Sequence, residues 1–94
     1  MYVLDRPNPI GGFDVEGPSS DSSCETFTAY HPLPSRHGMT IGELSRLFTV
    51  ERGIGADLRV VTLAGLQPSA LFDNCGQAWL DTSPNIRDLH AAAL

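Results

Sequence analysis

The stretch that follows residue 39 places the tightest constraint on the fold. Thr40 and Glu43 stand three positions apart, as in a capping box, where each side chain binds a backbone N–H of the first helical turn. Met39 and Leu44 flank this pair at the spacing of a hydrophobic staple. Apolar residues then recur at helical intervals on one face, and a glycine follows as a stop: Ile41, Leu44, Leu47, Phe48 and Gly53. The pattern predicts a helix over residues 41–52.

Short apolar segments on either side of this helix predict two strands. Residues 2–4 (Tyr-Val-Leu) form the first, which ends before Pro7. Residues 57–63 form the second, and its adjacent Val60 and Val61 suit a strand buried on both faces. A strand, a crossover with a helix and another strand form a βαβ unit, which is parallel and right-handed in nearly all proteins.

The remaining segments are mostly irregular. Residues 7–38 hold five of the seven prolines and predict one long loop, in which only residues 25–30 alternate like a possible strand. Residues 65–76 predict a second loop. Ser83 and Pro84 are expected to begin a short last helix, with Ile86, Leu89 and Ala93 on its buried side. The fold class is therefore α/β: strand, long loop, helix, parallel strand, loop and short helix.

This unit is expected to be an incomplete domain. Two parallel strands do not make a stable sheet, because their outer edges stay unpaired and their faces are only partly covered. We expect the neighbouring strands to come from missing parts of the same domain.

Composition excludes several classes of function. The net charge is −5 and the six cations are scattered arginines, so no basic face is available for nucleic acid. No run of eighteen apolar residues could span a membrane, and no signal peptide follows Met1. Cys24 and Cys75 lie far apart without a zinc-site spacing, while a disulfide between them stays open. We expect no metal and no cofactor.

Candidate site residues follow the expected strand ends. Parallel strands place their carboxyl ends on one rim, where ligands bind in open α/β sheets. Arg6 and Asn8 follow the first strand, Gln67 follows the second, and Glu16 and His37 lie in the connecting loop. We expect these side chains to converge there.

Each candidate also has a structural interpretation. Arg6 could pair with Asp5, Asn8 could hold a turn, and His37 could bond only to backbone. Nearer the end, Asn85 could cap a helix behind Ser83, and Trp79 could pack in a core rather than stack on a sugar.

The residues alone do not identify a reaction. Glycoside hydrolysis usually needs a pair of carboxyl groups, and Glu16 and Asp81 are available without surroundings that mark either as an acid. No phosphate-binding loop, catalytic triad order or metal cluster is present.

Five sequence pieces, in order, resemble one family. They are Val3 to Gly12 (VLDRPNPIGG), Val15 to Pro18 (VEGP), Pro34 to Leu44 (PSRHGMTIGEL), Asp57 to Val61 (DLRVV), and Trp79 with Ser83-Pro84-Asn85. Together they resemble the NamZ-type exo-β-N-acetylmuramidases, formerly the DUF1343 domain of unknown function. Each piece is weak alone, but the ordered set is specific.

The resemblance implies a fold, an activity and a location. It implies a Rossmann-like catalytic domain, of which residues 1–94 would be a central segment, and a smaller C-terminal domain beyond it. It implies a peptidoglycan-degrading glycoside hydrolase that releases N-acetylmuramic acid from non-reducing ends in cell-wall turnover, in a secreted or periplasmic setting. The acid/base glutamate is expected in the upstream half of the family's domain, so this segment receives no catalytic residue.

The resemblance also implies substrate contacts. Muramyl glycosides are the expected ligands, with substrate-binding roles for Arg6, Asn8, Glu16, His37, Ser83 and Asn85. The alternative is a non-catalytic α/β module, or an inactive fragment, that binds a sugar or a protein.

Overall fold

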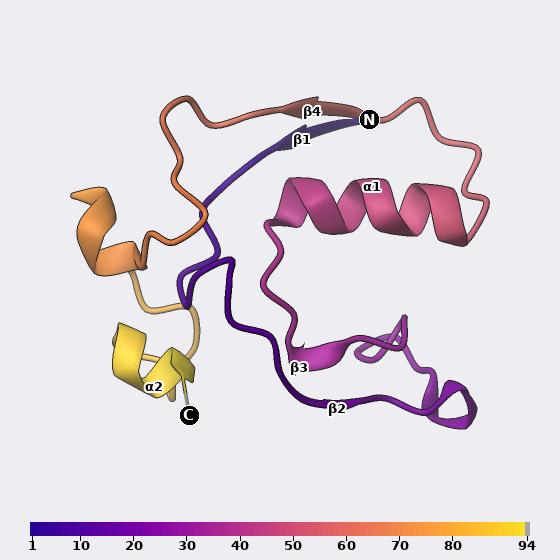
Figure 1. Ribbon diagram of the computed structural model, residues 1–94, viewed down its shortest axis with the longest axis horizontal. Coiled ribbons are helices and arrows are strands. Elements are labelled where there is room, and N and C mark those ends of the chain that lie inside the picture. Colours follow the sequence, from indigo (N-terminus) through magenta and orange to yellow (C-terminus); the bar gives the residue numbers. More distant parts are fainter. Residues whose placement is uncertain (94) are drawn as a thin grey trace.

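A computed structural model describes residues 1–93 and confirms the parallel βαβ unit. Leu94, the last residue of the predicted domain segment, lies outside the described residues. Strands β1 (Tyr2–Leu4) and β4 (Arg59–Val61) pair in parallel, with Val3 opposite Val60. Helix α1 (Ile41–Glu51) lies against this pair (Figure 1).

Helix α1 has the termini that its sequence predicts. Both bonds of the capping box are present: Thr40 Oγ1 accepts from the Glu43 N–H at 3.2 Å, and Glu43 accepts from the Thr40 N–H at 2.8 Å. The helix ends at Glu51, one residue earlier than expected. Gly53 follows with a φ of +60°, the left-handed conformation that glycine adopts without strain.

The absence of a side chain at Gly42 lets α1 approach the sheet. Gly42 is buried in the first turn of the helix. A Cβ built there would lie 2.7 Å from Val60 Cγ1 and 2.8 Å from the carboxyl carbon of Asp5. Any larger residue would force the helix away from both strands.

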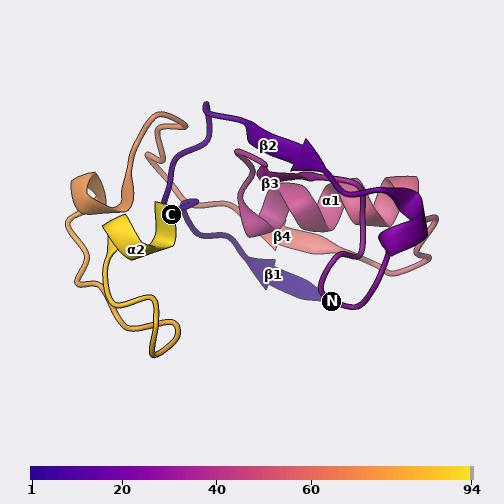
Figure 2. The same ribbon diagram turned by 90° about the horizontal axis from the view of Figure 1, so that it is seen from below.

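The loop predicted over residues 7–38 contains a pair of strands that the sequence did not reveal. β2 (Glu16–Ser19) and β3 (Pro34–Arg36) pair antiparallel, with an irregular register between Glu16 and Ser19. The pair lies on the side of α1 away from β1 and β4 (Figures 1 and 2). Prolines obscured the pattern, because an edge strand can include proline where no partner needs its N–H.

The possible strand over residues 25–30 was wrong. Thr26 and Ala29 exchange backbone hydrogen bonds with each other, so the segment folds back as a tight turn after the short helix η1 (Ser22–Cys24). The alternating residues therefore belong to a loop tip, where the Phe27 side chain is 98% exposed.

The last helix starts later than predicted. α2 spans Leu89–Ala93, and the Ala91 N–H donates to the Asp88 carboxylate at 2.7 Å. Ser83 and Pro84 instead begin a turn that the Ser83–Ile86 bridge closes. Asp88 therefore supplies the cap that was assigned to Ser83. The preceding loop contains the short helix η2 (Phe72–Cys75), and Trp79 packs edge-on against Phe72 at 5.2 Å.

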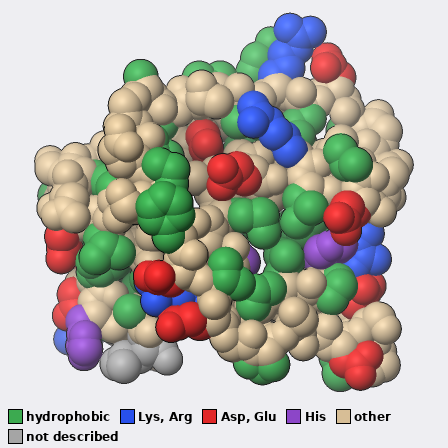
Figure 3. All heavy atoms as spheres, in the orientation of Figure 1, with side chains coloured by type: hydrophobic (Ala, Val, Ile, Leu, Met, Phe, Trp, Pro, Cys, Tyr) green, Lys and Arg blue, Asp and Glu red, His purple; other side chains and the backbone are tan. Residues whose placement is uncertain are grey.

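The sheet is covered on one face only. Val3 and Val60 face α1 and are half-buried, whereas Tyr2 and Leu4 are each 70% exposed on the other face. Val61 is 50% exposed, so burial on both faces of β4 was wrong for this segment. No hydrophobic side chain within residues 1–93 is fully buried, and hydrophobic side chains reach the surface between the elements (Figure 3).

Across residues 1–93, every helix falls short of the length and apolar character needed to cross a bilayer. Cys24 and Cys75 are free thiols.

Candidate functional site

The carboxylate of Asp5 ties the end of β1 to the start of α1. Its Oδ1 accepts from the Arg6 N–H at 3.0 Å and from the Gly42 N–H at 2.9 Å, and its Oδ2 accepts from Thr40 Oγ1 at 3.0 Å. Glu43 accepts from the Thr40 N–H on the same turn. Two protein carboxylates therefore occupy the N-terminus of α1, where the helix dipole favours negative charge.

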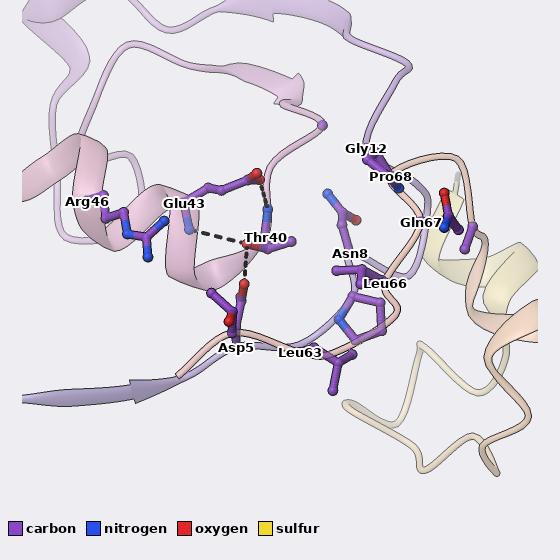
Figure 4. A pocket seen from close by; sticks show the side chains of 14 residues that line it. Asp5, Asn8, Gly12, Thr40, Glu43, Arg46, Leu63, Leu66, Gln67 and Pro68 are labelled. Carbon is purple, nitrogen blue, oxygen red and sulfur yellow. Dashed lines mark hydrogen bonds between the residues drawn. The ribbon is translucent and has the colours of Figure 1, made fainter. Parts of the chain in front are cut away.

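A cavity of about 260 Å³ opens beside this junction, and we call it the rim cavity. Thr40 and Glu43 lie across it from Asn8, Leu66 and Gln67 (Figure 4). Residues from the carboxyl ends of both parallel strands also line it: Asp5, Thr62 and Leu63. The cavity therefore lies where the topology of an open α/β sheet predicts a ligand site.

A second cavity, of about 360 Å³, brings together three of the predicted site residues, and we call it the loop cavity. Arg6, Asn8 and His37 all line it, against an apolar wall that includes Ile41 and Leu44 of α1. Asn8 lines both cavities, so the two are neighbours.

The side chain of His37 uses one ring nitrogen locally. Its Nδ1 accepts a hydrogen bond from the Met39 N–H at 3.1 Å. In the neutral imidazole this places the hydrogen on Nε2, which makes no hydrogen bond within residues 1–93. His37 is thus held by the backbone and retains one donor.

Asn8 also serves the local fold. Its Oδ1 accepts from the Ile10 N–H at 3.2 Å, and its Nδ2 donates to the Met39 carbonyl at 3.1 Å. These bonds fix the turn after β1 against the segment before α1, so the predicted structural role of Asn8 is present. Each polar atom keeps capacity for one further bond.

Arg6 and Asp5 do not form the ion pair considered from sequence. The only contact between them is the backbone N–H of Arg6 to the carboxylate, and the Arg6 guanidinium makes no ion pair within residues 1–93. The Asp5 carboxylate points toward the start of α1 instead, because the Gly42 N–H and the Thr40 hydroxyl donate hydrogen bonds to it.

Three other candidates lie away from both cavities. Glu16 pairs with Arg36 at 2.9 Å across the β2–β3 pair. Arg36 also donates hydrogen bonds to Asp14 at 3.1 Å and to the Ile10 carbonyl at 2.6 Å, so it holds the segment before β2 against β3. Ser83 Oγ accepts from the Asn85 N–H at 3.4 Å within the C-terminal turn. Substrate contact by Glu16, Ser83 and Asn85 remains a prediction.

Sequence reasoning missed the carboxylates of the rim cavity. Asp5 and Glu43 line it together, with Arg46 one turn along the helix. The sequence predicts only a capping role for Glu43, and nothing in it shows that a helix cap and a strand end will share a cavity. Within residues 1–93, no three His, Cys, Asp or Glu side chains gather as metal ligands.

Residues 1–90 match the family described as the N-terminal part of the exo-β-N-acetylmuramidase NamZ. The chain belongs to this family. It is 44% identical, over 86 residues, to the peptidoglycan β-N-acetylmuramidase NamZ of Bacillus subtilis strain 168. The matched region is 92% of this chain and 21% of that protein.

A solved structure confirms the fold of the family segment. The crystal structure of a DUF1343 family protein from Bacteroides fragilis NCTC 9343 superposes with a TM-score of 0.89 at 33% sequence identity. The superposition covers 97% of this chain and 24% of that one. The chain thus spans between a fifth and a quarter of the relatives that it matches, and its family is one of cell-wall glycoside hydrolases.

Proposed function

We propose that this chain forms part of the sugar-binding site of a glycoside hydrolase that releases N-acetylmuramic acid from the non-reducing ends of peptidoglycan fragments. Membership of the NamZ family and the relative in Bacillus subtilis support the substrate class. The convergence of Arg6, Asn8 and His37 on the loop cavity supports the location. Cell-wall turnover or recycling would then be the process that it serves.

The chemistry of the loop cavity suits an anionic sugar. N-acetylmuramic acid carries a lactyl carboxylate, and the exposed guanidinium of Arg6 can bind a carboxylate through two parallel N–H groups. The Nε2–H of His37 can donate to a hydroxyl or a carboxylate. The apolar wall from Ile41 and Leu44 can pack against the face of the ring.

The N-terminus of α1 is not a binding site for that carboxylate. Asp5 accepts from the Gly42 N–H, Glu43 accepts from the Thr40 N–H, and Thr40 accepts from the Glu43 N–H. Because these donors are used and two negative charges already lie there, a third carboxylate would be repelled. Arg6 is therefore the cation to which we assign the lactyl group.

We assign no catalytic residue to this segment. Asp5 and Glu43 share the rim cavity, but both oxygens of Asp5 and Oε2 of Glu43 are engaged in holding the helix. We propose that the acid/base carboxyl comes from another part of the enzyme's domain, and that residues 1–94 form a central segment of a Rossmann-like fold. The exposed outer face of the sheet, with Tyr2 and Leu4, supports the need for further covering elements. We also propose substrate contacts for Glu16, Ser83 and Asn85, although these three residues lie away from both cavities.

The substitution His37→Ala, in an intact family enzyme that carries this segment, tests the assignment. We expect kcat/KM on a chromogenic N-acetylmuramide to fall about 10- to 100-fold, the loss that accompanies one hydrogen bond to a charged group. The melting temperature should stay within a few degrees of wild type. His90→Ala, which removes an exposed imidazole on α2, serves as the control.

Two results would contradict the proposal. Unchanged kinetics in His37→Ala would remove the sugar-binding role. A collapse in stability, with activity retained at low temperature, would leave His37 with a structural role alone.

A further inference from the structure

His31 lies at the centre of a cluster that the proposed sugar site does not use. It precedes β3, and its side chain is only 11% exposed. Its Nδ1 accepts from Arg52 Nε at 3.1 Å, and its Nε2 lies 3.0 Å from a carboxylate oxygen of Glu51. The ring also packs at 5.5 Å from Phe48. Both ring nitrogens are therefore engaged by the C-terminal end of α1.

Arg52 extends the same cluster to the loop tip. Its Nη2 donates to Glu25 at 2.7 Å and to the Tyr30 carbonyl at 2.6 Å, and its guanidinium lies 5.1 Å from the centre of the Tyr30 ring. The hydrogen bond from Arg52 lowers the pKa of the Glu25 carboxyl, and the same bond raises the pKa of Arg52. We call these contacts, made by Glu25, Tyr30, His31, Glu51 and Arg52, the histidine clasp.

The hydrogen bonds fix the protonation state that the clasp needs. Arg52 Nε carries a hydrogen and can only donate, so His31 Nδ1 must present a lone pair. The ring is then neutral, with its hydrogen on Nε2 directed at Glu51. A proton added at Nδ1 would replace the acceptor with a donor and set a second positive charge against Arg52.

Protonation of His31 at Nδ1 would have two opposing electrostatic effects. The cationic ring would attract Glu51 and Glu25 more strongly, and it would repel Arg52. Glu51 has half of its side chain in solvent, so its attraction is screened more than the repulsion between His31 and Arg52, whose side chains are 11% and 28% exposed. Arg52 also holds Glu25 and the Tyr30 carbonyl, so its displacement would release the loop tip as a unit.

We propose that the histidine clasp is a pH-sensitive latch. At neutral pH it holds residues 25–31 against α1, and proton uptake by His31 in mildly acidic solution releases them. The released segment lines a groove of about 630 Å³ that also reaches His37, so the latch controls how open this flank of the loop cavity is. Histidine is the side chain that ordinarily takes up a proton between pH 8 and pH 5.

Hydrogen exchange on the intact protein that carries this segment tests the latch. Protection of peptides covering residues 24–33, corrected for intrinsic exchange, should fall at least fivefold from pH 7.5 to pH 5.5. Peptides within residues 43–50 of α1 should keep their protection. Unchanged or increased protection of residues 24–33 at the lower pH would overturn the proposal.

Two substitutions separate the latch from general acid sensitivity. His31→Asn keeps an acceptor near the Nδ1 position but cannot titrate, so residues 24–33 should show the same protection at both pH values. Arg52→Lys keeps the charge but lacks Nε, so residues 24–33 should already be released at pH 7.5. A wild-type pH response in His31→Asn would exclude His31 as the sensor, and wild-type protection of residues 24–33 in Arg52→Lys at pH 7.5 would exclude Arg52 as the residue that holds them.

Discussion

The backbone N–H of Gly42 donates to the carboxylate of Asp5 at 2.9 Å, across 37 positions of the chain. This bond joins the residue after β1 to the first turn of α1. It is possible only because Gly42 has no side chain, since a Cβ would overlap both Asp5 and Val60. The junction beside the rim cavity therefore depends on one glycine.

Gly42→Ala in the intact protein should destabilise the fold by about 1–3 kcal/mol, the usual cost of overpacking a close contact. Urea unfolding would measure the loss. Gly55→Ala is the matched control, because a Cβ at Gly55 meets nothing within 4 Å. Equal stabilities for the two variants would show that α1 can move off the sheet without cost.

Glu25→Gln should lower the melting temperature at neutral pH and have less effect in acid. The hydrogen bond from Arg52 lowers the pKa of the Glu25 carboxyl, so the ion pair stabilises the fold at neutral pH. This stabilisation is lost in acid, at the latest as the pH falls through the lowered pKa and earlier where the histidine clasp has already released Arg52. The difference in melting temperature from wild type should therefore be larger at pH 7 than at pH 3. Asp57→Asn, which disrupts an exposed pair at 3.7 Å, should change little at either pH.

The 94-residue polypeptide produced alone should be marginally stable or aggregate. It has no fully buried hydrophobic side chain within residues 1–93, and its parallel strands have open edges. Calorimetry and light scattering would show a broad transition or association. A sharp melt of a monomer at an ordinary mesophilic temperature would contradict this expectation.

The same polypeptide should not release sugar from a chromogenic N-acetylmuramide. The carboxylates of the rim cavity are committed to the start of α1, and Glu16 is paired with Arg36. An assay at high protein concentration checks the expectation. Turnover above that of a sample lacking the polypeptide would place a catalytic group within this segment.

The parts of the fold that sequence predicted are those encoded locally. The cap at Thr40 and Glu43, the turn at Gly53 and the apolar run of β1 each depend on a few adjacent residues. The β2–β3 pair was missed because Arg36 holds it through Asp14, Glu16 and the Ile10 carbonyl, partners that lie twenty or more positions away.

Sequence also predicted part of the convergence of the candidate site residues. Strand ends located Arg6 and Asn8, and the motif before α1 located His37, so their shared cavity follows from topology. The orientation of the Asp5 side chain toward α1 could not be predicted from the sequence, because it depends on the close approach of α1 to the sheet that Gly42 permits.

The two carboxylates at the start of α1 make that end of the helix unfavourable for a further anion. In many α/β proteins a bare helix N-terminus receives phosphate. In this protein the carboxylates of Asp5 and Glu43 accept hydrogen bonds from the backbone N–H groups of Gly42 and Thr40 instead. A phosphorylated sugar would meet negative charge where other folds offer free N–H groups, so the start of α1 should not serve as a phosphate site in this protein.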